Sequence, residues 1–124
     1  MNWYKKSQGQ MNANQIAEKW RQQGIVLYVF ENNNIIILDS IIVPKEKRKQ
    51  GIGTQIMEEL INYSDSVGKR LELSPGQKDD YNGTTSKGRL VNFYKRFGLL
   101  ENKGKNKDFG TSKTMYREPN NELV

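Results

Sequence analysis

One segment constrains the fold of this chain more than any other. An apolar run at residues 35–43 passes through a basic, glycine-containing turn into a pattern of apolar residues at helical spacing. The run is mostly β-branched, which favours a strand, and Pro44 cannot donate to a sheet ladder. The apolar positions of the helical pattern are Ile52, Ile56, Met57, Leu60 and Ile61. The segment predicts a buried strand, a turn and a helix that begins near Gly53.

The turn between this strand and helix has the composition of a phosphate-binding site. It carries Lys45, Lys47, Arg48 and Lys49 against one acid, Glu46. Glycines let a backbone approach a ligand closely, and the amides and dipole of a helix N-terminus attract anions. We expect the turn to hold a pyrophosphate. The other interpretation is an ordinary strand, turn and helix with a solvated basic turn.

Two common phosphate motifs do not fit this turn. A Walker loop needs Gly-Lys-Ser or Gly-Lys-Thr at its end, whereas Gly53 is followed by Thr54 and Gln55. A dinucleotide fingerprint needs a third glycine or alanine, and Ile56 stands at that position. A phosphate site in this turn would therefore follow a different pattern.

The pattern that fits is Arg48-x-x-Gly51-x-Gly53 after a strand ending at Val43. It resembles motif A of the GCN5-related N-acetyltransferases (GNAT), whose turn binds the pyrophosphate of acetyl-coenzyme A (acetyl-CoA). Residues 92–99 are similar to motif B of that family, in which a tyrosine, here Tyr94, lies four residues before a glycine. Residues 86–98, 106–109 and 115–117 further resemble short acetyltransferases of phage and mobile elements.

This resemblance implies where the coenzyme would bind. Backbone groups of residues 41–43 would pair with pantetheine where the central strands splay apart, and residues 48–54 would surround the pyrophosphate, mostly through amides. These residues are Ile41, Ile42, Val43, Arg48, Lys49, Gln50, Gly51, Ile52, Gly53 and Thr54. Many family members have an asparagine seven residues before the tyrosine. This chain has Lys87 there, which would meet a phosphate instead.

Acetyl transfer also needs a base for the amine, a donor for the thioester oxygen and an acid for the sulfur. By resemblance, Tyr94 would protonate the thiolate and the Val43 amide would be the donor; the alternative for Tyr94 is a core or rim tyrosine. Strand alternation predicts Asp39 on the face of Ile41 and Val43, an apolar setting suited to a base. Its alternative is a structural hydrogen bond at a strand irregularity, and Glu72 is the reserve base.

The remaining pattern predicts a single short α/β domain with a mixed sheet, a compact GNAT fold with about three helices over residues 1–124, in which residues 1–10 are loosely held. The further expected elements follow in chain order. They are a helix at 12–23, capped by Asn12 or Asn14; a strand at 25–30, antiparallel to 35–43; a strand at 69–74, parallel to it; a polar loop at 75–85, either an acceptor-side lid or a tolerated insertion; a helix at 86–96; and strands at 99–102 and 114–117.

Composition removes several other classes. The chain has no cysteine and no histidine, so disulfides, thiol catalysis and histidine catalysis are excluded, and no metal site is expected. No apolar run is long enough to span a membrane, and the first residues lack a secretory signal, so we expect a cytoplasmic protein that does not bind membranes. Basic clusters at 45–49 and 103–107 and the net charge of +6 suggest nucleic acid, but no nucleic-acid-binding signature accompanies them.

The sequence therefore predicts an N-acetyltransferase that uses acetyl-CoA as cosubstrate and reacts by direct attack of an amine. The acceptor would be a protein lysine, a chain terminus or a small amine; the phage resemblance adds host defence proteins. We expect the first basic cluster to serve coenzyme phosphates, the second to be a solvated hairpin loop, and the protein to be a monomer or dimer. The alternatives are a non-catalytic coenzyme-A-binding module and a basic nucleic-acid-binding protein.

Overall fold

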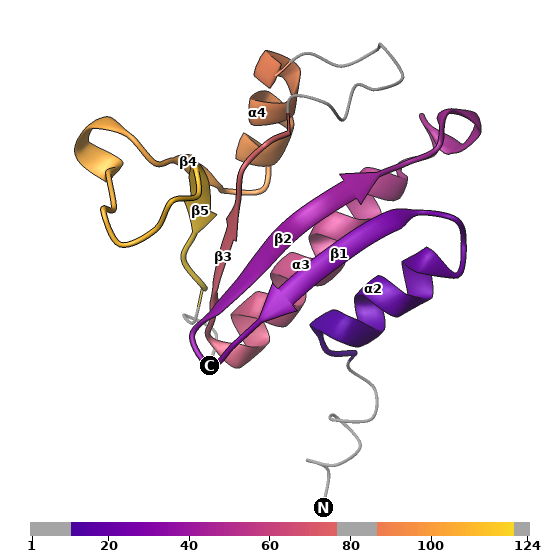
Figure 1. Cartoon of the computed structure of the whole chain (residues 1–124), viewed down its shortest axis with the longest axis horizontal. Helices are drawn as coiled ribbons and strands as arrows, with labels where there is room; N and C mark the ends of the chain where they lie inside the picture. Colours follow the sequence, from indigo (N-terminus) through magenta and orange to yellow (C-terminus); the bar gives the residue numbers. More distant parts are fainter. Residues whose placement is uncertain (1–10, 77–86, 121–124) are drawn as a thin grey trace, which may run out of the picture.

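The computed structural model describes residues 11–76 and 87–120, and Figure 1 shows their arrangement. Its elements in chain order are α2 (Ala13–Arg21), β1 (Val26–Glu31), β2 (Ile35–Ile42), the 3-10 helix η1 (Lys45–Lys47), α3 (Ile52–Val67), β3 (Arg70–Leu73), α4 (Lys87–Lys95), β4 (Leu100–Glu101), the 3-10 helix η2 (Gly104–Asn106) and β5 (Met115–Arg117). The predicted helices and strands are confirmed, with ends within two residues of the predicted ones. The expectations for residues 1–10 and for most of the polar loop lie outside the described residues.

The strands form one mixed, five-stranded sheet in the order β1-β2-β3-β5-β4. β1 pairs with β2 antiparallel, β2 with β3 parallel, and β5 with both β3 and β4 antiparallel. The parallel pair is joined through α3, as expected for a crossover connection. Together with the three described α-helices, this sheet confirms the predicted α/β GNAT-like fold.

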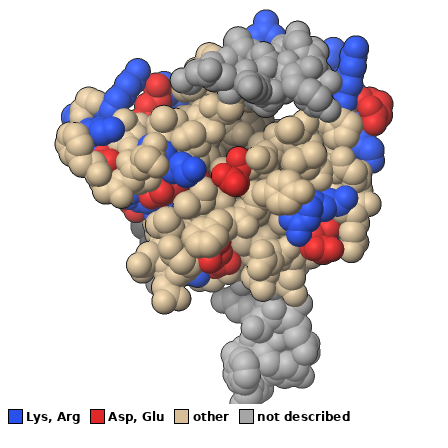
Figure 2. Space-filling model, in the orientation of Figure 1, with Lys and Arg blue, Asp and Glu red and all other residues tan. Residues whose placement is uncertain are grey.

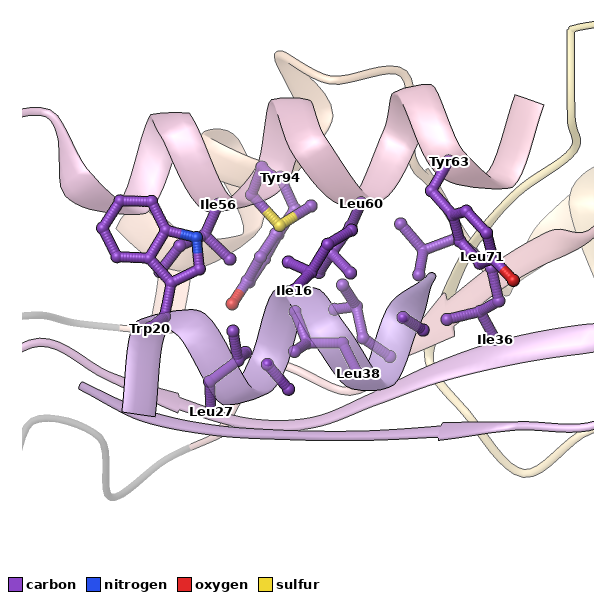
Figure 3. Close-up of a cluster of buried hydrophobic side chains, with 14 of the residues drawn as sticks. Ile16, Trp20, Leu27, Ile36, Leu38, Ile56, Leu60, Tyr63, Leu71 and Tyr94 are labelled. Carbon is purple, nitrogen blue, oxygen red and sulfur yellow. The ribbon is translucent and has the colours of Figure 1, made fainter. Parts of the chain in front are cut away.

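Helices α2 and α3 lie on the same side of the sheet and enclose the core (Figure 3). Apolar side chains from both helices point toward inward-facing residues of β1 and β2, such as Leu27 and Leu38. The two helices are also tied at one polar contact, where Glu59 accepts hydrogen bonds from Lys19 Nζ at 2.7 Å and Trp20 Nε1 at 2.9 Å. The opposite side of β1 and β2 is covered by neither helix.

The ends of α2 follow from local sequence. Of the two predicted caps, Asn12 is the observed one. Its side chain accepts from the Gln15 amide at 2.9 Å, and the Gln15 side chain accepts from the Asn12 amide at 2.9 Å, which makes a reciprocal capping box. After the helix, Gly24 takes φ +88°, a conformation that glycine adopts without strain, and the chain turns into β1.

The set of β2 side chains that point toward the core changes parity partway along the strand. Tyr28 pairs with Ser40 and Val29 pairs with Leu38, so Asp39 is an extra residue at a β-bulge. Before the bulge, Ile36 and Leu38 face the core; after it, Ile41 and Val43 do so. Strict alternation along residues 35–43 is therefore wrong, because one inserted residue shifts the parity of every side chain that follows.

The bulge coincides with the point where β2 leaves β3. Parallel pairing joins residues 35–38 of β2 to residues 70–73 of β3, ending at the pair Leu38 and Leu73. β2 then continues to Ile42, and Figure 1 shows the two strands diverging in a V. Past Leu38, the side of β2 toward β3 thus lacks a β3 partner. None of the described helices is long and apolar enough to cross a membrane.

Candidate functional site: the turn before α3 and the splayed strand

The basic turn has a backbone that few residue types accept. After η1, Lys49 has φ +67° and Gly51 has φ +77°, both in the left-handed region. Gly51 is the N-cap of α3, and a Cβ built on it would meet no atom within 4 Å. The space in front of Gly51 is therefore open, and a glycine here both relieves the backbone and exposes its amide to a ligand.

Three consecutive amides at the start of α3 face this open space. The first intrahelical bond of the helix runs from the Gln55 amide to the Gly51 carbonyl at 3.0 Å. The amides of Ile52, Gly53 and Thr54 precede it and find no acceptor among residues 11–76 and 87–120. Because α3 is 16 residues long, its dipole adds positive potential at this point. The arrangement suits a pyrophosphate.

A surface cavity of about 240 Å³ lies at this point and joins three elements. The end of β2 contributes Val43, the turn contributes basic residues, and α4 contributes Phe93. Its lining is Val43, Lys47, Arg48, Lys49, Gly51, Ile52, Gly53, Thr54 and Phe93. Most of the residues predicted to bind coenzyme are thus brought together, whereas Ile41, Ile42 and Gln50 are not part of this lining.

Phe93 is a lining residue that sequence reasoning did not assign to the site. It packs against the core and also forms one wall of the cavity. A Cβ on Gly53 would lie 3.5 Å from the Phe93 ring, an ordinary contact, so α4 packs closely on the start of α3. Its place directly before Tyr94 in the motif B segment was the available signal.

Two of the turn's four cations are engaged by backbone carbonyls. Lys47 Nζ donates to the Gln23 carbonyl at 2.7 Å, and Arg48 Nε donates to the Val43 carbonyl at 2.9 Å. Lys45 and Lys49 are exposed. Lys47 thus links the turn to the loop before β1, and Arg48 links it to the end of β2. Their charges add to the positive potential of the turn from these positions.

The backbone of β2 beyond the bulge is open toward the V. Arg21 Nη1 donates to the Leu27 carbonyl at 2.8 Å, which indicates that this carbonyl points away from β2. Leu27 and Ile41 are then a pair of the non-hydrogen-bonded type, and the backbone groups of Ile41 point away from β1 as well. By alternation Val43 points the same way. Its carbonyl is occupied by Arg48, so its amide and the Ile41 groups are the ones directed toward the V.

Tyr94 is part of the core. Its side chain is 5% exposed, and its ring meets the ring of Phe93 edge-on at 5.3 Å between centroids. Figure 3 shows its hydroxyl directed from α4 toward the strands. The spacing of Leu90, Phe93 and Phe97 predicts that they face the core, but these three are only partly buried, and Tyr94 is the more deeply buried residue.

The setting predicted for Asp39 is wrong. As the extra residue of the bulge it does not share the core-facing side of Ile41 and Val43, and its side chain is exposed. The reserve base Glu72 is 4% exposed, but it accepts from Arg70 Nη1 at 3.3 Å and Thr111 Oγ1 at 2.9 Å, within a polar cluster of its own. Lys87 is the first residue of α4, and its side chain lies outside the described residues.

The geometry and the comparisons agree on the class of protein. A mixed sheet that splays beside a helix N-terminus and its phosphate-suited turn defines an acetyltransferase-type domain. The model of the acetyltransferase (GNAT) family matches residues 21–99, more than half of the chain, and the chain belongs to this family. Among curated proteins the comparison finds no match.

Two solved structures are similar to this fold. The crystal structure of the anti-CRISPR protein AcrVA5 has a TM-score of 0.57 and 20% sequence identity, over 74% of this chain and 87% of that chain. The structure of Ard1 from Thermoplasma volcanium has a TM-score of 0.49 and 18% identity, over 77% of this chain and 61% of that chain. The likeness to AcrVA5 supports the fold.

Proposed function

We propose that this protein is an acetyl-CoA-dependent N-acetyltransferase that transfers the acetyl group to an amine by direct attack. One observation carries the proposal. β2 leaves β3 after Leu38, and four residues later the same strand leads into a turn whose amides at Ile52, Gly53 and Thr54 lack acceptors among the described residues. An elongated ligand with a phosphate end and an amide-bearing arm needs both features next to each other.

The chain's own groups suggest how acetyl-CoA would lie. Its pyrophosphate would accept from the α3 amides under the positive potential of Lys49 and the helix dipole. Its pantetheine arm would run along β2 and bond to the backbone of Ile41 and Val43 in place of the missing β3 partner. The Val43 amide would then be placed to donate to the thioester oxygen as negative charge develops there. Lys87 is proposed to meet a phosphate of the coenzyme.

The reaction would join the amine nitrogen to the acetyl carbon and break the carbon–sulfur bond. We propose Tyr94 as the acid that protonates the sulfur, since its buried hydroxyl is directed from α4 toward the strands beside the V. Asp39 remains the proposed base, now on the ground of its position at the bulge and its exposure to an arriving amine rather than an apolar setting. The amine loses one proton to the base, and the sulfur gains one from the acid.

The acceptor amine is the open part of this proposal. A protein lysine, a chain terminus and a small amine all provide the required nucleophile. Similarity to an anti-CRISPR protein at 20% identity supports the fold alone, so a host defence protein is one acceptor to test among others. A coenzyme-A-binding module without turnover would use the same turn and splay, and only chemistry distinguishes the two.

The test combines binding with turnover. We expect acetyl-CoA to raise the melting temperature, and we expect Tyr94→Phe, which keeps the buried ring, to lower turnover roughly 100-fold with little change in coenzyme affinity. Asp39→Asn should shift the pH profile of the rate. Coenzyme binding without turnover on any amine would favour the non-catalytic module, and no thermal response to acetyl-CoA would remove the proposal altogether. Turnover in both variants equal to the wild type would leave the proton transfers to water or substrate.

A further inference from the structure

One face of the sheet carries large apolar side chains exposed to solvent. Helices α2 and α3 occupy the inner side of β1 and β2 (Figure 3). On the outer side of β1, Val26 is 37% exposed, Tyr28 55% and Phe30 56%. These three residues alternate with the buried Leu27 and the partly buried Val29, as strand geometry requires.

The apolar surface continues onto β2. Phe30 pairs with Ile37 and Val26 pairs with Ile42, so these side chains stand next to each other on the same face. Ile37 and Ile42 are both partly exposed. We call the set Val26, Tyr28, Phe30, Ile37 and Ile42 the outer strip. Exposed apolar patches of this kind mark interaction sites in soluble proteins.

The outer strip adjoins the V between β2 and β3. Tyr28 pairs with Ser40, the residue that follows the bulge at Asp39. From the inner side the V is approached by α3, α4 and the core residues between them, such as Tyr94. On the outer side the strip is exposed, so from the described residues we place the approach of an acceptor amine there, across the strip.

The charge on this face favours a protein over a polyanion. Figure 2, in the orientation of Figure 1, shows a surface that is mostly uncharged over β1 and β2, with acidic side chains near its middle and a small group of basic and acidic side chains at its right. The strip itself contains no cation. Arg21, which stacks on the Tyr28 ring at 5.5 Å, also pairs with Glu18. Nucleic acid binding would need a row of cations here.

We propose that the outer strip docks the acceptor: an extended protein segment in which a lysine is flanked by apolar residues. This inference rests on the proposed function and names the substrate class of that site. The apolar neighbours of the lysine would bury Tyr28 and Phe30, and the lysine side chain would reach past Ser40 and Asp39 to the thioester in the V. The exposed carboxylate of Asp39 would attract the ammonium before it loses its proton.

The experiment compares two peptides of equal charge and length. In one, a single lysine has Phe and Val neighbours; in the other, the neighbours are Gly and Ser. With acetyl-CoA, we expect the wild type to have a kcat/KM for the apolar peptide roughly tenfold higher or more, the ratio that burial of one large apolar side chain supports. Tyr28→Ser and Phe30→Ser should each remove most of that preference, mainly through KM.

Val26→Ser and Val67→Ser form a matched pair of controls, because the two valines are 37% and 41% exposed and Val67 lies at the end of α3, away from the strip. Only the Val26 variant should lower the preference. Every variant should keep the melting response to acetyl-CoA; its loss in the wild type would overturn the proposed function rather than the docking surface.

Four outcomes would overturn the docking surface in a protein that binds acetyl-CoA. The first is equal use of both peptides, and the second is use of neither. The third is a preference that survives Tyr28→Ser and Phe30→Ser. The fourth is a wild-type dimer in analytical ultracentrifugation that Phe30→Ser dissociates, because the strip would then be covered by a second copy of the chain.

Discussion

The two basic turns of this protein look alike in sequence and differ in the elements that follow them. Both follow a strand, both contain a short 3-10 helix, and both have residues with positive φ: Lys49 and Gly51 in the first turn, Gly104 in the second. The first turn continues into the 16-residue helix α3. The second returns to the sheet at β5, so no helix N-terminus follows it.

Several polar groups of the second turn bond within the turn or to its flanking strands. Asn102 is 7% exposed, and its side chain donates to the carbonyls of Asp108 and Lys113 and accepts from the Asp108 amide. Tyr116 Oη donates to the Asn106 carbonyl, and Lys103 pairs with Glu101. In the first turn, the amides of Ile52, Gly53 and Thr54 lack acceptors among the described residues, and they lie at the start of a long α-helix. We expect this combination, rather than charge alone, to make a phosphate site.

The largest effect that separates the turns should come from their glycines. Gly51 and Gly104 both have positive φ and open space around a built Cβ, so a valine strains each turn similarly. Acetyl-CoA at about 100 times its dissociation constant should stabilise the wild type by about 2.7 kcal/mol. Gly51→Val should abolish this gain by blocking approach to the amides, and Gly104→Val should retain it.

The measurement is the melting temperature of each variant with and without acetyl-CoA. Each variant is compared with its own ligand-free form, so the strain energy cancels. If acetyl-CoA raises the melting temperature of both variants, or of neither, the proposed difference between the two turns is wrong.

A smaller effect should come from Arg48, which links the first turn to β2 through the Val43 carbonyl. We expect Arg48→Ala to weaken acetyl-CoA binding roughly tenfold, with Lys49→Gln, an exposed cation of the same turn, weakening it less. S-acetyl-pantetheine, which lacks the pyrophosphate, separates two causes. If Arg48 holds the end of β2 in place, its loss slows transfer from this short thioester too. If its charge alone matters, the short thioester is unaffected.

The sequence predicted much of this arrangement because its signals are local. The apolar run at 35–43, the cap at Asn12 and the helical spacing from Ile52 onward each depend on neighbouring residues, and all correspond to observed elements. The turn's residues and their motif also lie within one short segment. Residues close in sequence are therefore close in the cavity, where Val43 lies with residues 48, 49 and 51–54.

The rest depended on contacts between distant segments. The bulge at Asp39 is set by pairing with β1, and no alternation rule reveals an inserted residue in advance. Phe93 lines the cavity because α4 packs on Gly53, and Lys47 is engaged because the loop before β1 passes near it. The Arg70 cluster, in which one guanidinium pairs with Glu72, Asp108 and Glu118, also joins distant segments and was therefore not predicted.

We expect that cluster to make the second turn sensitive to acid. The hydrogen bond from Arg70, with a further one from the Gly110 amide, holds the pKa of Asp108 below its usual range. A carboxyl whose pKa is lower when folded adds stability above its unfolded value of about 3.9 and loses it as the pH falls through the folded value. We expect amide hydrogen exchange at residues 102–114, corrected for intrinsic rates, to lose protection in that range before residues 48–54 do.

Asp108→Asn provides the matched control, because it removes the negative charge at every pH with little change in size. At pH 7 this variant should show the faster exchange that acid produces in the wild type, and its exchange should then depend less on pH. Equal protection of the variant and the wild type at pH 7 would mean that the ion pair does not hold the second turn.

The smallest effect should come from the charges of the second turn. Replacing Lys103, Lys105 and Lys107 together by Gln should leave acetyl-CoA affinity unchanged within about twofold, because no α-helix begins at their turn. The substitution lowers net charge by three, so any binding to DNA or RNA should weaken and become less steep in its dependence on salt.

We expect binding of DNA or RNA to the wild type to be weak and without sequence preference at physiological salt. Titration of labelled duplexes at several salt concentrations measures it. A tight, sequence-selective complex that acetyl-CoA does not disturb would contradict this prediction. It would indicate that the basic residues serve to bind nucleic acid and that the resemblance of the first turn to motif A is coincidental.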